Sequence, residues 1–206
     1  MVLAIDTCLS ACSVALLRDG EALALASEPM ARGHQERLGT MTHEVMDAAG
    51  LAFSAVDRIA VTVGPGSFTG LRVGLAFAKG LALALDRPCV GVGTLEALAA
   101  SVDPAGRHIA AIDAGRGHVF LQAFEDGRPL MAPDNLPLHT AAARVAELGA
   151  GAVLVGPGAH LVALGASVNA IAAPSPEAVA RLAAAAPLVP PRPLYLRAPD
   201  ARIKAA

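Results

Sequence analysis

The sequence predicts an α/β protein of two related lobes, each a mixed β-sheet with helices. Three landmarks that occur twice in the same order carry this prediction. The first is an apolar run that ends in aspartate, at Asp6 and again at Asp113. The second is an Asp-Gly hairpin signal, at Asp19-Gly20 and Asp126-Gly127. The third is a Gly-Pro-Gly turn, at Gly64–Gly66 and Gly156–Gly158. The first two pairs share one offset of 107 residues, and the third pair is closer because the second helical segment is shorter. We expect lobes at residues 1–100 and 101–206, the second one reduced.

The elements of the first lobe are predicted from its apolar runs and from the turn and helix-ending residues between them. Asp19-Gly20 separates two short runs as a hairpin turn does, and Leu38, Met41 and Val45 recur at helical spacing before Gly50. The predicted elements are strands at 2–5, 12–17 and 22–26, a helix at 31–49, a strand at 59–63, a helix at 69–85 and a strand at 88–92.

The second lobe repeats this order with fewer residues. Its predicted elements are strands at 108–112, at 119–124 and near 128, a helix at 140–148 and a strand at 152–155. Residues 187–193 hold four prolines and indicate an extended, stiff segment, and Tyr195 just after it is suited to anchor that segment on the body or on a partner.

Composition excludes several classes of protein. The 206 residues are 54% apolar and 17% charged, which excludes disorder, and the net charge of −2 argues against binding nucleic acid unaided. Three cysteines are too few for a disulfide framework, so we expect a reducing cytoplasm. Residues 9–12 imitate a lipoprotein cleavage box and 148–176 a membrane span. The first lacks a preceding Lys or Arg and the second contains a helix-breaking Gly-Pro-Gly, so we reject both.

Two strand-end aspartates suggest a cleft. A doubled unit of this kind is the build of the actin-like ATPase superfamily, in which such an aspartate from each lobe faces the cleft, an analogy of fold alone. Asp6, Thr7, Asp113 and Gly115 are therefore candidates for a vestigial nucleotide or phosphate cleft. With no Lys or acidic base nearby, capping of strand-end turns is the stronger interpretation, and we expect no cofactor and no metal.

The glycine-rich segment 64–74 is the strongest local signal. Its spacing does not fit a Walker A loop, a dinucleotide fingerprint or a nucleophile elbow. A turn between strand and helix can present backbone N–H groups to an anion. However, Gly70, Gly74 and Ala78 recur every four residues, so close packing or an interface is the favoured interpretation, with Leu71 beside them.

The first long helix carries the second signal, a wide apolar surface with three of the five methionines. Its members are Met30, Leu38, Met41, Val45 and Met46. Methionine-rich faces often contact partners, whereas a core-facing stripe is the commoner interpretation of any such helix. We expect Leu38, Met41 and Val45 to be buried and Met30 and Met46 to remain for a partner. His34 and His43 are nine residues apart, and no histidine pair has metal-ligand spacing.

These features together resemble the TsaB (YeaZ) family of tRNA threonylcarbamoyladenosine biosynthesis proteins. The resemblance spans the whole chain, and the Gly64–Gly74 segment is highly specific to the family. The other matching stretches are Ala4–Thr7 with Ala11–Ala15, Gly33–Leu38, Pro88–Leu95, Ala111–Arg116 and Pro193–Arg197.

The resemblance implies a two-lobe actin-like subunit without catalysis of its own. In that family the protein pairs with the paralogue TsaD, and a small ATPase, TsaE, joins them. The complex transfers threonylcarbamoyl to adenosine 37 of tRNAs that read ANN codons. TsaD carries a His-x-x-x-His metal pair where this chain has Thr94 and Leu98. The absence of these two histidines indicates that the chain is the non-catalytic partner of TsaD and not the enzyme.

The resemblance also implies where partners bind. In the family, two first-lobe helices form a four-helix bundle with TsaD, or a homodimer when TsaD is absent, and tRNA is contacted mainly through the complex. This assigns to the partner surface Met30, His34, Leu38, Met41, Val45, Met46, Gly70, Leu71, Gly74 and Ala78. We accordingly expect Gly74→Leu to abolish pairing while sparing the fold.

Three alternatives come from other classes. An independent actin-like ATPase or sugar kinase would need an acidic base and a full second lobe. An M22-type metallopeptidase would need the missing histidines. A solitary tRNA binder would need a basic stripe.

Overall fold

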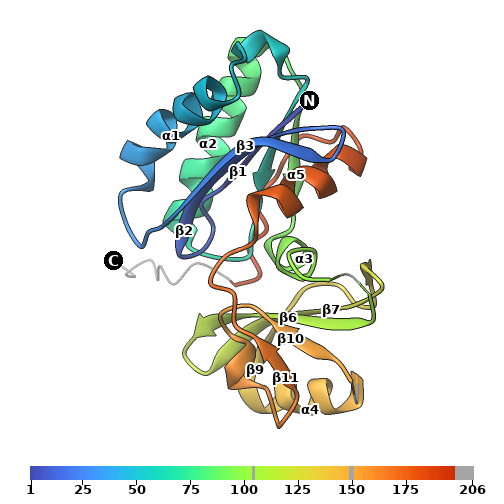
Figure 1. Ribbon diagram of the computed structural model, residues 1–206. Coiled ribbons are helices and arrows are strands. Elements are labelled where there is room, and N and C mark those ends of the chain that lie inside the picture. Colours follow the sequence, from blue (N-terminus) through green and yellow to red (C-terminus); the bar gives the residue numbers. More distant parts are fainter. Residues whose placement is uncertain (104, 149–150, 198–206) are drawn as a thin grey trace, which may run out of the picture.

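Two lobes, each with its own sheet, make up the computed structural model, which describes residues 1–103, 105–148 and 151–197 (Figure 1). The first sheet has the order β3-β2-β1-β4-β5, with β2 antiparallel to β1 and β3, and β4 parallel to β1 and β5. Its strands are β1 (Val2–Asp6), β2 (Ala11–Arg18), β3 (Glu21–Pro29), β4 (Arg58–Thr62) and β5 (Cys89–Val92).

The second sheet repeats this arrangement. Its order is β11-β10-β6-β7-β8, and β9 also pairs with β7. The strand β6 is antiparallel to β7 and parallel to β10, just as β1 is antiparallel to β2 and parallel to β4 in the first sheet. The strands are β6 (Arg107–Gly115), β7 (His118–Glu125), β8 (Arg128–Pro129), β9 (Asp134–Pro137), β10 (Val153–Val155) and β11 (Ser167–Asn169).

Helices cover both faces of the first sheet. Figure 1 shows α1 (His34–Ala48) and α2 (Phe68–Leu85) side by side on one face and α5 (Pro176–Ala185) on the other. The apolar residues of α1 and α2 form one core with β1, β2 and β4, and those of α5 form a second core with Ala4, Ala15 and Ala60. The helix α3 (Thr94–Ala99) joins the lobes, α4 (Leu138–Leu148) packs on the second sheet, and 3-10 turns occur at Phe53–Ala55 and Ala159–Leu161.

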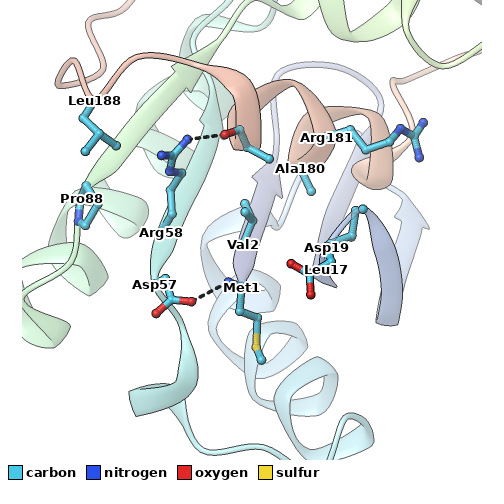
Figure 2. A pocket seen from close by; sticks show the side chains of 12 residues that line it. Met1, Val2, Leu17, Asp19, Asp57, Arg58, Pro88, Ala180, Arg181 and Leu188 are labelled. Atoms are coloured by element: carbon cyan, nitrogen blue, oxygen red, sulfur yellow. Dashed lines mark hydrogen bonds and ion pairs between the residues drawn. The ribbon is translucent and has the colours of Figure 1, made fainter.

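The helix α5 falls within the predicted second lobe, residues 101–206, but it packs on the first sheet. Arg58 donates through Nη1 to the carbonyl groups of Ala183, Ala184 (3.0 Å) and Ala186 (3.2 Å) at the C-terminal end of α5. Figure 2 shows the hydrogen bond to Ala184. The carbonyl groups at a helix end lack intrahelical donors, so a guanidinium group satisfies them well. The helix α5 therefore belongs structurally with the first lobe.

The C-terminal strap, Pro190–Arg197, runs from α5 across both lobes. Leu194 N–H donates to the carbonyl of Val63 after β4 (2.7 Å), and Tyr195 OH accepts from Arg72 Nε on α2 (3.2 Å). Arg197 Nη1 donates to the carbonyl of Ala114 in β6 (2.9 Å). The strap is extended as predicted, and Tyr195 anchors it on the body of the chain.

The other predicted elements agree with the structure to within a few residues, while β9, β11, α3 and α5 were not predicted individually. The N-terminus of α5 carries a recognisable signal, because the Ser175 side chain accepts from Ala178 N–H and Pro176 stands in the first turn.

Candidate functional site

The glycine-rich segment packs directly on the loop after β1. A Cβ atom at Gly66 would lie 2.3 Å from the carbonyl oxygen of Cys8, and one at Gly70 would lie 2.0 Å from that of Thr7. A Cβ atom at Gly74 would lie 2.5 Å from Thr7 Oγ1. These glycines therefore let α2 approach β1 closely, which confirms the packing interpretation.

The residues of the predicted vestigial cleft do not gather around one cavity. Asp6 is fully buried, and its Oδ1 accepts from Thr62 Oγ1 (2.5 Å) and Cys8 N–H (3.1 Å), while Oδ2 has no partner among the described residues. Burial raises the pKa of this carboxyl group. Thr7 is also buried, and its hydroxyl donates to the carbonyl of Gly70 (2.7 Å). Both side chains are therefore closed to solvent, and Thr7 is bonded to the start of α2.

Asp113 and Gly115 lie in the other lobe at the end of β6. Asp113 Oδ1 accepts from Gly115 N–H (2.7 Å), which is the turn-capping arrangement. Of the four residues predicted for the cleft, Asp113 alone lines the cavity between the lobes.

Nearly all the residues assigned to the partner surface are buried within this chain, as expected for Leu38, Met41 and Val45 but not for Met46. All except Met30 are buried, and Met30 is half-buried: the buried set is His34, Leu38, Met41, Val45, Met46, Gly70, Leu71, Gly74 and Ala78. Met46, expected to face a partner, has 1% of its surface exposed. Gly74→Leu would drive α2 away from β1, so it tests the fold and not pairing.

The outward face of α2 offers a different surface. Ala76, Gly80 and Ala84 are exposed at four-residue spacing, Leu83 is 85% exposed, and a Cβ atom at Gly80 would meet nothing within 4 Å. We name this outward stripe, Ala76, Gly80, Leu83 and Ala84, the α2 surface.

The length and apolar character of α2 reinforce this finding. Among the described residues α2 alone is long and apolar enough for a membrane span, with mean hydropathy 1.4, but core helices pass the same test. Only 33% of its residues are buried. Val73, Phe77, Leu81 and Leu85 are half-buried against the core, so the part of α2 left exposed is the outward side that carries the α2 surface.

A cavity of about 850 Å³ lies between the lobes. Leu71 of α2 and Leu194 of the strap contribute apolar wall from one side, and Ile112 and Phe120 contribute it from the other. Arg72, Arg197, His34 and Asp113 supply the polar part of the lining. Of the residues predicted for a cleft only Asp113 lines this interlobe cavity, because the rest of its walls come from segments far apart in the sequence.

A second hollow, of about 450 Å³, lies where α5 meets the start of β1 (Figure 2). Its charged groups are largely used within the chain: the Met1 ammonium group binds Asp57 (2.6 Å), and Arg58 binds the end of α5. It is therefore a junction of the fold and carries no evident binding chemistry.

Metal ligands are not gathered in the described parts of the chain, where no three His, Cys, Asp or Glu side chains form a group suited to a cation. Thr94 and Leu98 are fully buried on α3, and neither side chain can replace an imidazole ligand.

Comparison with known proteins supplies the family. Residues 27–148, more than half of the chain, match the family model described as TsaD, tRNA N6-adenosine threonylcarbamoyltransferase. A Pseudomonas aeruginosa structure, described as an uncharacterized protein with similarity to peptidase YeaZ, superposes with TM-score 0.83 and 35% identity over 95% of this chain and 99% of that one. YeaZ from the same organism gives TM-score 0.78 and 36% identity, over 89% and 90% of the two chains. The chain belongs to the TsaB (YeaZ) family.

Other TsaB-family relatives agree. TsaB of Escherichia coli K12 is 39% identical over 60% of this chain and 54% of its own length. An uncharacterized protein of Mycobacterium tuberculosis is 34% identical over 98% of this chain and 93% of its own. The match spans about half the length of the relatives that carry the TsaB name. The two-lobe actin-like fold predicted from the internal repeat is confirmed.

Proposed function

We propose that this chain is the non-catalytic dimerisation subunit of a complex that synthesises threonylcarbamoyladenosine in tRNA. It pairs with a TsaD-like paralogue, which performs the transfer to adenosine 37 of ANN-decoding tRNAs, and a TsaE-like ATPase joins the pair. The α2 surface carries this proposal, because its exposed small residues and the exposed Leu83 form an apolar stripe suited to a partner helix.

Small residues make the α2 surface suited to a partner helix. Ala76, Gly80 and Ala84 project no more than a methyl group, so a second helix can approach α2 closely, and Leu83 then becomes buried between the two. Burial of Leu83 removes a large apolar side chain from water, worth about 2 kcal/mol. In the absence of the paralogue, a second copy of this chain fills the same place.

A non-catalytic role is supported by the chemistry of the lobes. The strand-end carboxylate Asp6 is fully buried, and Thr94 and Leu98 stand where the resemblance places metal ligands in TsaD. The net charge of −2 supports a subunit whose partner carries most of the tRNA contact. A tRNA-modifying complex of this kind works in the cytoplasm.

Pairing is tested by Gly80→Leu. A leucine at this exposed position favours the helix but fills the space that a partner helix would occupy. We expect the variant to fold with an unchanged circular dichroism spectrum and to lose co-elution with the TsaD-like protein. Ala143→Leu, on the exposed side of α4, adds the same side chain in the other lobe and should co-elute normally.

The role in modification is tested by reconstitution. The chain is combined with the organism's TsaD-like and TsaE-like proteins, and each protein is omitted in turn from a tRNA threonylcarbamoylation assay. We expect no product without this chain and none from this chain alone. Co-elution of Gly80→Leu at the wild-type level would refute the α2 surface, and product formed by the chain alone would refute the non-catalytic role.

A further inference from the structure

The interlobe cavity has the dimensions and composition of a small-molecule site, and pairing through α2 does not use it. Its volume of about 850 Å³ lies within the range of about 300–1,000 Å³ that ligand sites occupy. Leu71, Ile112, Phe120 and Leu194 give it apolar walls from both lobes. Apolar walls with a few convergent polar groups are the usual build of such sites.

Two arginines on the cavity wall are held in place without a carboxylate partner. Arg72 lies over the Phe68 ring, 3.7 Å from its centroid, and its Nε donates to Tyr195 OH. Arg197 gives one N–H to the carbonyl of Ala114. Across residues 1–103, 105–148 and 151–197 neither guanidinium group forms an ion pair, so each keeps N–H donors for another acceptor. Fixed guanidinium groups with unused donors are suited to bind an anion.

The charge of the cavity limits the kind of anion. Two arginines face one acidic side chain, Asp113, so the lining has an excess of one positive charge at neutral pH. The described residues hold no group of three metal ligands, and Asp6 is sealed off, so nothing there holds the cation of a metal-bound triphosphate. A single anionic group on an apolar body matches this lining best.

We propose that the interlobe cavity binds an amphipathic carboxylate. Its aromatic or branched aliphatic body packs between Leu71 and Phe120, and its carboxylate accepts hydrogen bonds from Arg72 and Arg197. This inference concerns the isolated chain and does not rest on the pairing role.

The test uses isothermal titration calorimetry of the full chain with two ligands of the same shape. Indole-3-acetate carries one negative charge and indole-3-acetamide none. We expect the acetate to bind with a Kd below about 1 mM and the acetamide to bind at least about tenfold more weakly, the factor carried by a charge-assisted hydrogen bond. Equal affinities, or no heat with the acetate, would overturn the proposal. So would tighter binding of AMP, which would reassign the cavity to a nucleotide.

Variants locate the site. We expect Arg72→Gln and Arg197→Gln each to weaken acetate binding about tenfold, whereas Arg144→Gln, on the exposed side of α4, should bind as the wild type does. Ser10→Trp places a large ring at an exposed position on the cavity wall and should abolish binding while leaving the thermal unfolding transition in place. Wild-type affinity in Ser10→Trp or in either arginine variant would overturn the site. Retained acetate binding by Gly80→Leu would show that the cavity and the α2 surface are separate.

Discussion

Gly70→Ala and Gly80→Ala add the same methyl group to one helix, and we expect them to change stability in opposite directions. At Gly70 the new Cβ atom would lie 2.0 Å from the carbonyl oxygen of Thr7, whereas ordinary contacts begin at 3.4 Å. The obstacle is backbone, so no side-chain rotation relieves it, and α2 must move about 1.4 Å away from β1. At Gly80 the new atom meets nothing within 4 Å.

The expected magnitudes follow from what that displacement breaks. It separates Thr7 Oγ1 from the carbonyl of Gly70 and Ser67 N–H from the carbonyl of Cys8, two hydrogen bonds worth about 1 kcal/mol each. Overpacking adds about 1–3 kcal/mol. The greater helix propensity of alanine returns about 1 kcal/mol. We therefore expect Gly70→Ala to lower the free energy of unfolding by about 2–4 kcal/mol and Gly80→Ala to raise it by about 0.5–1 kcal/mol.

Urea denaturation followed by circular dichroism measures both variants against the wild type. Dilute protein and a control series at several concentrations remove any contribution from self-association through α2. Equal shifts of the two midpoints, or a stabilised Gly70→Ala, would refute the assignment of the inward and outward faces of α2.

Three further predictions follow from burial and hydrogen bonding. Arg58→Met should lower the free energy of unfolding, measured in urea, by about 1–3 kcal/mol, because the carbonyl groups at the end of α5 lose their hydrogen-bond donor. An unchanged free energy of unfolding would contradict this role of Arg58. The stability of Asp6→Asn relative to the wild type should increase as pH rises above about 4. The raised pKa of Asp6 means that ionisation of this carboxyl group costs more free energy in the folded state than in the unfolded state. A difference in Tm between the two proteins that does not grow with pH would count against this prediction. Cys8 and Cys12 should resist alkylation by iodoacetamide at pH 8 in the folded chain, since burial raises the pKa of their thiols to about 12 and about 11; mass spectrometry showing rapid modification of either would contradict their burial.

Much of the fold is legible in the sequence because its signals are local. An Asp-Gly pair between apolar runs specifies a hairpin, and the repetition of Asp6, Asp19 and Gly64 at Asp113, Asp126 and Gly156 indicates two lobes. Each lobe indeed places its antiparallel hairpin beside a parallel strand, as β1, β2 and β4 do in the first lobe. The packing of α5 on the first sheet could not be predicted in this way, because no local pattern indicates which sheet a distant amphipathic helix will cover.

The candidate site divides in the same way. The segment Gly64–Gly74 and the stretches that match the TsaB family are sequence properties, and they lead to the proposed function without coordinates. The sequence suggested a cleft between the lobes but not its apolar lining, since Leu71, Phe120 and Leu194 are brought together only when the strap crosses both lobes.

The helix α2 shows most plainly where sequence stops and tertiary structure begins. By itself the sequence determines a helix that is apolar and rich in small residues, but it carries two such stripes, one at Gly70, Gly74 and Ala78 and another at Ala76, Gly80 and Ala84. Either stripe permits a close approach, so spacing cannot say which one meets the sheet. The contacts of Gly70 with the Thr7 backbone and of Gly74 with the Thr7 side chain decide it, because neither position has room for a Cβ atom, and the second stripe is thereby left on the surface.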